Sequence, residues 1–240
     1  MVKKKRPTVV SGIIILLAIA YGVYSQSNPE NQTISTEPSI SSTMPSVTID
    51  HLSEIPDYNG EKVITLNQNN PNFNETDLSL ANGSWTIFSD LDDLNRVGPA
   101  NGMLSQELMP TEERESLNVK PTGWHQKFYD DQPLYNRCHL VAFQLSGENN
   151  NWKNLMTGTA RFNHPGMTKY EEEVGDYIRE TKHHVRYRVS PYFKDDELVA
   201  RGVQMEAQSI EDSNVSYNVF IYNVQDGVTI DYTTGYSKAS

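Results

Sequence analysis

The sequence predicts an α+β domain built on a central, mostly antiparallel sheet. Apolar side chains recur at helical spacing over residues 168–181, which indicates one amphipathic helix. Directly after it, residues 185–189 alternate valine and tyrosine with arginine, a pattern typical of a strand with one buried face. Two further strand segments, 198–210 and 217–224, follow across short polar turns. Neighbouring strands joined by short turns favour antiparallel hairpins over parallel crossovers.

The first 24 residues are expected to be an export signal or an N-terminal membrane anchor. A basic cluster from Lys3 to Arg6 precedes an apolar run of 16 residues at 9–24. The run is shorter than the roughly 20 residues that cross a bilayer, and Ala-Ile-Ala at 18–20 offers a small-residue cleavage site. Cleavage and retention both remain open. Either outcome predicts an extracellular protein, secreted or anchored to the outer face of the membrane through residues 9–24.

Residues 25–54 are rich in Ser, Thr, Pro and Asn, so they cannot bury a core and are expected to form a disordered tether. Residues 55–240 then form one catalytic domain of ordinary size. The first half of this domain gives weak signals. They predict a short strand at 63–66, a short helix over 90–97 and another over 112–117.

Composition limits the classes of function. One cysteine excludes an intramolecular disulfide framework and any multi-cysteine zinc site. The net charge of −11 disfavours a stoichiometric nucleic-acid binder, because lysine and arginine drive phosphate binding. Ten basic and eight acidic side chains fall between Lys120 and Arg188, a local net charge of +2. This distribution favours a local catalytic cleft over extended adhesion.

The segment Tyr-Asn-Arg-Cys-His-Leu at 135–140 is the most informative part of the chain. Arg137 and His139 lie two residues apart, just before an apolar strand expected at 140–145. Two residues at this spacing share one face of an extended segment, so one side chain can hold a phosphate oxygen while the other moves a proton. Such a pair also occurs on ordinary protein surfaces, so by itself it does not define a site.

The segment Asn-Arg-Cys-His at 136–139 resembles the Asp-Arg-Gly-His signature of the DNA/RNA non-specific endonucleases, the ββα-metal (His–Me finger) nucleases. The wider run 135–163 resembles the branch of streptococcal-type secreted DNases and membrane-anchored DNA-entry nucleases. The resemblance covers 124–232, and more weakly the part from Tyr58. It implies a ββα-metal active-site motif and a sugar-non-specific endonuclease that leaves 5′-phosphate and 3′-hydroxyl ends. The implied cofactor is Mg²⁺, with Mn²⁺ as an alternative. The implied substrates are double- and single-stranded DNA and RNA, and no protein partner is inferred.

The resemblance also assigns roles to residues. His139 matches the general base, and Arg137 matches the signature arginine that contacts phosphate. Asn163 matches the asparagine that supplies the only direct protein ligand to Mg²⁺. From the residues alone, Asn163 reads equally well as a turn or helix-capping residue.

Three further positions follow from the same resemblance. Asn154 matches a second active-site asparagine, Glu171 matches a helix carboxylate that orients metal-bound water, and Arg161 is a looser candidate for phosphate contact. From the residues alone, Glu171 reads equally well as part of a solvated helix face. The signature departs from that of the family at Asn136 and Cys138. Side chains alternate along an extended segment, so Cys138 faces away from Arg137 and His139, which argues against a thiol nucleophile.

Three alternatives stay open. A non-catalytic, surface-tethered nucleic-acid receptor could use the same fold, and a cell-surface adhesion or structural protein would suit the acidic charge. A zinc hydrolase is disfavoured because His183 and His184 are adjacent and would face opposite sides of a strand, and because the sequence has no HExxH motif.

Overall fold

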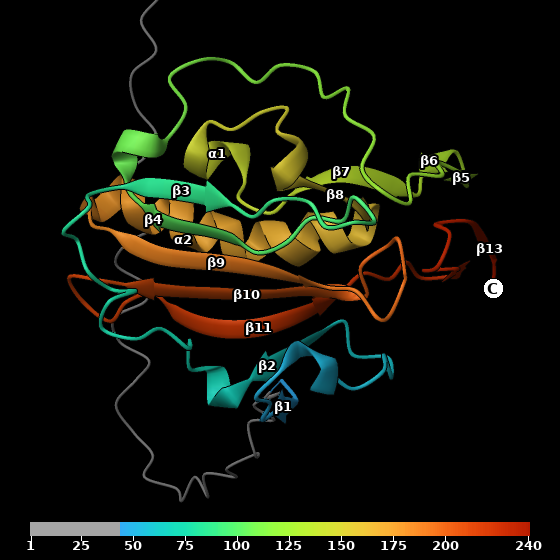
Figure 1. Ribbon diagram of the computed structural model, residues 1–240, viewed down its shortest axis with the longest axis horizontal. Coiled ribbons are helices and arrows are strands. Elements are labelled where there is room, and N and C mark those ends of the chain that lie inside the picture. Colours follow the sequence, from blue (N-terminus) through green and yellow to red (C-terminus); the bar gives the residue numbers. More distant parts are fainter. Residues whose placement is uncertain (1–43) are drawn as a thin grey trace, which may run out of the picture. The chain divides into compact units, whose positions relative to one another are not determined.

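The computed structural model describes residues 44–240 (Figure 1). The predicted signal or anchor, and the predicted tether up to residue 43, lie outside the described residues. Within residues 44–240, no helix has the length and apolar character needed to cross a membrane.

A seven-stranded sheet forms the centre of the domain, in the order β1-β2-β11-β10-β9-β4-β3. Every neighbouring pair is antiparallel except β1 and β2, which are parallel. The strands are β1 (Ser46–Val47), β2 (Val63–Leu66), β3 (Trp85–Phe88), β4 (Ala100–Leu104), β9 (Val185–Tyr192), β10 (Gly202–Ser209) and β11 (Ser216–Tyr222). The predicted α+β class with a mostly antiparallel sheet is confirmed.

A separate antiparallel hairpin leads into the long helix and completes a ββα unit. Its elements are β7 (Tyr135–His139), α1 (Phe143–Ser146), η4 (Trp152–Asn154), β8 (Leu155–Thr159), the π-helical turn η5 (Phe162–Met167) and α2 (Thr168–Thr181). In Figure 1, α2 runs between strands β9 to β11 and the β7–β8 hairpin. The bounds of α2 are those predicted from the sequence.

Smaller elements complete the described part of the chain. They are the 3-10 turns η1 (Leu52–Glu54), η2 (Asn67–Asn69) and η3 (Gln106–Leu108), the hairpin of β5 (Phe128–Tyr129) with β6 (Gln132–Pro133), and the hairpin of β12 (Val228–Ile230) with β13 (Ser237–Ala239).

The main core lies between α2 and the sheet. Val174 and Ile178 of α2 are fully buried in one cluster with Tyr187 of β9 and Met205 of β10. Burying a side chain of this kind contributes roughly 1.5–3 kcal/mol. The helical periodicity of 168–181 and the strand alternation of 185–189 therefore arise because both elements bury one face in the same interface. This is why the sequence predicted both elements.

A second, smaller core covers the opposite face of the sheet at its β2–β11 end. Ile49 and Ile55 are buried there against Leu66, Phe220 and Tyr222. Residues 44–54 thus belong to the folded domain, and the expected start at residue 55 was too late. The apolar residues that anchor this stretch stand singly among polar ones, so its composition resembles that of the tether before it.

Two predicted helices are absent from residues 44–240. Over 90–97 the chain makes a tight turn instead: the Asp92 carboxylate accepts hydrogen bonds from the backbone amides of Leu94 and Arg96, and Asn95 has a φ of 59°. Aspartate bonds of this kind compete with helix formation. Residues 112–117 are irregular.

The strand predicted at 140–145 was misplaced. The observed strand β7 ends at His139, so it consists of the signature segment itself, and residues 143–146 form α1. The chain leaves the strand because the buried Asn154 side chain holds Val141: the Asn154 Oδ1 accepts from the Val141 amide, and the Asn154 Nδ2 donates to its carbonyl.

Candidate active site

The β7–β8 hairpin has one face directed to the core and one directed to the candidate site. Cys138 of β7 and Met156 of β8 are opposite each other and lie in the main core. Arg137 is opposite Thr157, and both reach the segment 119–122, where the Arg137 Nε donates to the Val119 carbonyl and the Thr157 hydroxyl to the Thr122 carbonyl. Alternation along β7 places His139 on the same face as Arg137.

Cys138, which departs from the signature glycine, is accommodated by a glycine on the neighbouring strand. A Cβ atom on Gly158 would lie 2.5 Å from the Cys138 Sγ, so the thiol occupies the space of the missing side chain. Burial raises the pKa of the Cys138 thiol well above its usual value. A fully buried, protonated thiol is a packing group and not a nucleophile.

His139 is 6% exposed, and its two ring nitrogens have different neighbours. Nε2 lies 2.7 Å from the Asn149 carbonyl oxygen, which can only accept, so Nε2 carries the proton and Nδ1 is the free base. Arg114 Nη2 lies 3.5 Å from Nδ1. The pKa of His139 is lowered to about 4, mainly by burial and also by the Arg114 cation, while the bond to the Asn149 carbonyl opposes the change. At neutral pH the imidazole is uncharged, as a general base must be.

An open cleft of about 560 Å³ includes Arg114 in its lining, and through Arg114 it is connected to His139, which does not itself line the cleft. Arg137 and Asn163 both line it, together with Arg114 and Trp124. The Arg137 guanidinium lies 4.6 Å from the centre of the Trp124 ring, and its Nε bond to Val119 fixes its direction. Within residues 44–240 the terminal nitrogens of Arg137 make no hydrogen bond, so they are free to bind an anion.

Asn163 lies in η5, the turn between β8 and α2, and faces the same cleft as Arg137. In the described part of the chain its side-chain amide has no hydrogen-bond partner, and no group of three or more His, Cys, Asp or Glu residues there could hold a metal. A single neutral oxygen ligand suits Mg²⁺, which keeps most of its waters, and does not suit a structural zinc site. The residues present fit a hydrated magnesium ion.

Asn154 does not face the cleft. It is fully buried and holds the turn after β7, through its two bonds to Val141 and through its own carbonyl, which accepts from Leu140. Because this turn follows His139 directly, Asn154 is placed to position the end of β7 rather than to touch a substrate.

Glu171 lies on the inner face of α2, beneath β7, and is 6% exposed. The pKa of its carboxyl is raised to about 8, mainly by burial and also by the charge of Glu172, while Arg114 opposes the change. The solvated face suggested for this residue by sequence alone is therefore wrong. Glu171 is close enough to Arg114 to feel its charge, which places the carboxyl under the site.

Arg161 lies elsewhere. It lines a separate groove with Lys62 and Lys169, and its backbone amide donates to Gln225. The structure therefore brings Arg137 and Asn163 into one cleft, with His139 and Glu171 each near Arg114 of its lining, but it does not bring Arg161 there.

Arg114 is the one residue of this site that the sequence did not indicate. It comes from the irregular segment 110–121, contacts His139 and lines the cleft beside Arg137. Within the sequence Glu-Glu-Arg-Glu at 112–115 it reads as one charge on a solvated surface. Nothing local in the sequence distinguishes it, because long-range contacts place it.

A ββα unit with a free guanidinium and an amide oxygen in one cleft, and a neutral imidazole on the same strand face as that guanidinium, defines a phosphodiester-hydrolysing enzyme of the ββα-metal class. The family model of DNA/RNA non-specific endonucleases matches residues 76–211. This match covers more than half of the chain, and the protein belongs to that family.

Solved structures agree with this assignment. NucA from Streptococcus agalactiae with no metal bound is 28% identical, with a TM-score of 0.69 over 79% of this chain and 92% of that chain. The same nuclease with a magnesium ion bound gives 26% identity and a TM-score of 0.68, covering 79% of this chain and 93% of that one. The Sda1 nuclease with a bound zinc ion is 26% identical, with a TM-score of 0.57 over 65% of this chain and 81% of that chain.

Proposed function

We propose that this enzyme is a Mg²⁺-dependent endonuclease that cuts DNA and RNA without regard to the sugar and leaves 5′-phosphate and 3′-hydroxyl ends. The observation that carries the proposal is the uncharged, buried His139, with Nδ1 unprotonated and 3.5 Å from Arg114 Nη2, on the same strand face as Arg137, which lines one cleft with Asn163. A magnesium ion is bound in the related NucA structure, which supports the choice of cofactor.

In this mechanism His139 Nδ1 takes a proton from the water that attacks phosphorus, and becomes an imidazolium. The bond from Nε2 to the Asn149 carbonyl holds the ring in the tautomer that this step needs. Arg137 binds a non-bridging phosphate oxygen, while Trp124 and the Val119 carbonyl keep its guanidinium in place. The departing 3′ oxygen receives a proton from solvent.

The remaining groups support these two. Asn163 would hold the magnesium ion, which, when bound, stabilises negative charge on the phosphate and on the departing oxygen. Glu171 supports that site from beneath, and Asn154 positions the end of β7. Arg114 adds to the effect of burial that lowers the pKa of His139. Arg161, in its separate groove, can contact phosphate only further along a bound strand.

All these contacts are directed to phosphate, which carries no sequence information and is the same in DNA and RNA. The net charge of −11 limits long-range attraction and favours release of the product. A receptor that binds without cutting would not need a histidine with a lowered pKa, and it would leave a plasmid intact. We place the enzyme outside the cell, secreted or held at the membrane through residues 9–24.

Removing the metal tests the proposal. With Mg²⁺ present, supercoiled plasmid should be nicked and then degraded, EDTA should stop the reaction, and excess Mg²⁺ should restore it. A single-stranded RNA should be cut under the same conditions. End-labelling should give 5′-phosphates. Cleavage that persists in EDTA, or ends that carry 3′-phosphate, would contradict the mechanism.

The pH dependence tests the state of His139. Because the base must be unprotonated, kcat/KM should be constant above the pKa of His139 and fall below it, near pH 4 rather than at the ordinary histidine value of about 6.5. In Arg114→Gln this acid limb should move to higher pH, since one cation beside Nδ1 is lost. Arg179→Gln, an exposed arginine of α2, serves as the control. An acid limb at the same pH in both variants would remove Arg114 from this role.

A further inference from the structure

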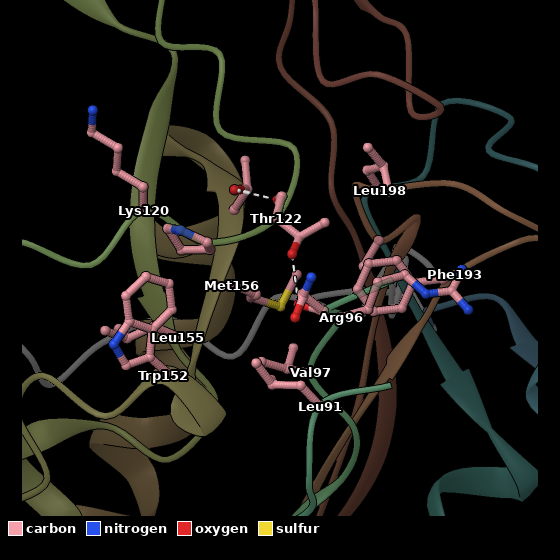
Figure 2. Close-up of a pocket in the computed structure, with 14 residues that line it drawn as sticks. Leu91, Arg96, Val97, Lys120, Thr122, Trp152, Leu155, Met156, Phe193 and Leu198 are labelled. Carbon is pink, nitrogen blue, oxygen red and sulfur yellow. Dashed lines mark hydrogen bonds between the residues drawn. The ribbon is translucent and has the colours of Figure 1, made fainter. Parts of the chain in front are cut away.

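A second cavity, of about 260 Å³, lies along strand β8 of the β7–β8 hairpin (Figure 2). Leu155 and Thr157 line it, and they are the direct cross-strand neighbours of His139 and Arg137. Such neighbours lie on one face with their Cα atoms about 4.5–5.5 Å apart. The cavity is therefore one strand away from the groups that would hold the scissile phosphate.

The walls of this cavity suit a flat, apolar ring. Figure 2 shows Trp152 and Leu155 on one side and Phe193 and Leu198 on the other, with Val97 below. Trp152 is 56% exposed, although it is one of the largest apolar side chains in the protein. An indole with an uncovered face beside a cavity provides a surface for stacking.

A free cation lies at the same place. Lys120 lines the cavity and forms no ion pair with any residue in 44–240. The neighbouring cations are already engaged, Lys153 with Asp90 at 2.5 Å and Arg96 with Asp92 at 2.7 Å. Lys120 is thus the group available to an anion, and the ligand that fits both features is a planar ring that carries a phosphate.

The threonine hydroxyls of the cavity are not available to distinguish one base from another. The Thr122 hydroxyl donates to the Asn95 carbonyl and the Thr157 hydroxyl to the Thr122 carbonyl, so both donors are used within the protein. Stacking accepts any base, because every base has a π face. A site of this kind adds affinity without sequence preference.

We propose that this cavity binds an unpaired nucleobase of the substrate, from the nucleotide next to the scissile phosphate, with Trp152 stacked on the base and Lys120 on a flanking phosphate. The inference rests on the proposed function. It adds a preference for single-stranded or locally opened substrate, since a base must leave its pair to enter. It also explains how an acidic protein holds nucleic acid, because stacking does not depend on net charge.

The test compares two single strands, an oligothymidylate and an abasic strand of the same length with the same phosphates. Trp152→Ala should raise KM for oligothymidylate roughly 5- to 100-fold, the range expected for one stacked base, with kcat within about twofold. It should leave the abasic strand unaffected, and Trp152→Phe should restore most of the affinity. Lys120→Gln should raise KM for both strands. Phe128→Ala, which removes an aromatic ring that is 62% exposed on the β5–β6 hairpin, is the matched control.

Equal effects of Trp152→Ala on both strands, or the same effect of Phe128→Ala, would overturn the proposal. Binding separates it from the proposed function. In the His139→Ala protein with EDTA, thymidine 5′-monophosphate should quench tryptophan fluorescence, deoxyribose 5-phosphate should not, and Trp152→Phe should abolish the response. Quenching without any cleavage by the wild-type protein would reject the nuclease mechanism and keep the cavity. Cleavage without quenching would reject the base-binding cavity and keep the nuclease mechanism.

Discussion

His139→Ala is expected to lower kcat for plasmid cleavage about 10²- to 10⁴-fold, the contribution typical of a positioned general base. The loss should appear in kcat and not in the affinity for DNA, because Arg137 and the rest of the cleft remain in place. It should also persist at every Mg²⁺ concentration, since the imidazole acts on water and is not proposed as a metal ligand. Single-turnover cleavage and a separate binding isotherm measure the two quantities.

The control for this variant is His125→Ala. His125 is the residue after Trp124, but its side chain is exposed and has no role in the mechanism. It stacks on Tyr236, and the two ring centres are 4.0 Å apart. Its activity should stay within a few-fold of wild type. Because His139 is buried, its replacement by alanine leaves a cavity of the size of the ring. Added imidazole should bind there and restore part of the activity. A His139→Ala protein as active as the wild type would end the assignment of the base.

The sequence predicted the parts of the fold that local patterns decide. The helix 168–181 and the strand beginning at Val185 were predicted because each buries one regular face against the same core. The signature segment was found by its resemblance to a family, and the structure places Arg137 and Asn163 in one cleft. In the helix and the strand, the buried residues recur at a fixed spacing. In the signature segment, the residues that identify it are adjacent in the chain.

The rest depends on contacts between distant residues. The segment that carries Arg114 has no regular structure of its own. Two asparagines of another loop hold it in place: Asn149 donates to the Glu115 carbonyl, and Asn150 accepts from the backbone amides of Asn118 and Val119. The same loop supplies the carbonyl that fixes His139. Such loop-to-loop bonds leave no periodic trace in the sequence. The resemblance likewise named Asn154 but could not show that it is buried and positions a turn.

Asn163→Ala is expected to reduce activity strongly at ordinary Mg²⁺ and to raise the Mg²⁺ concentration needed for half-maximal rate by about 100-fold, the upper end of the 10- to 100-fold known for groups that only support a metal ligand. Excess Mg²⁺ should restore part of the rate, because water can replace one lost oxygen. Asn163→Asp is the matched variant. It keeps an oxygen ligand and adds a charge, so it should bind Mg²⁺ at least as well as the wild type.

The two substitutions also bear on each other. If the base and the metal act on one phosphate, their losses are not independent, and His139→Ala/Asn163→Ala should be far less impaired than the product of the two single effects. Fully multiplicative losses, or an Asn163→Ala protein with unchanged Mg²⁺ dependence, would place the metal away from Asn163. The reaction would then need a different ligand in the cleft that Arg114 and Arg137 share.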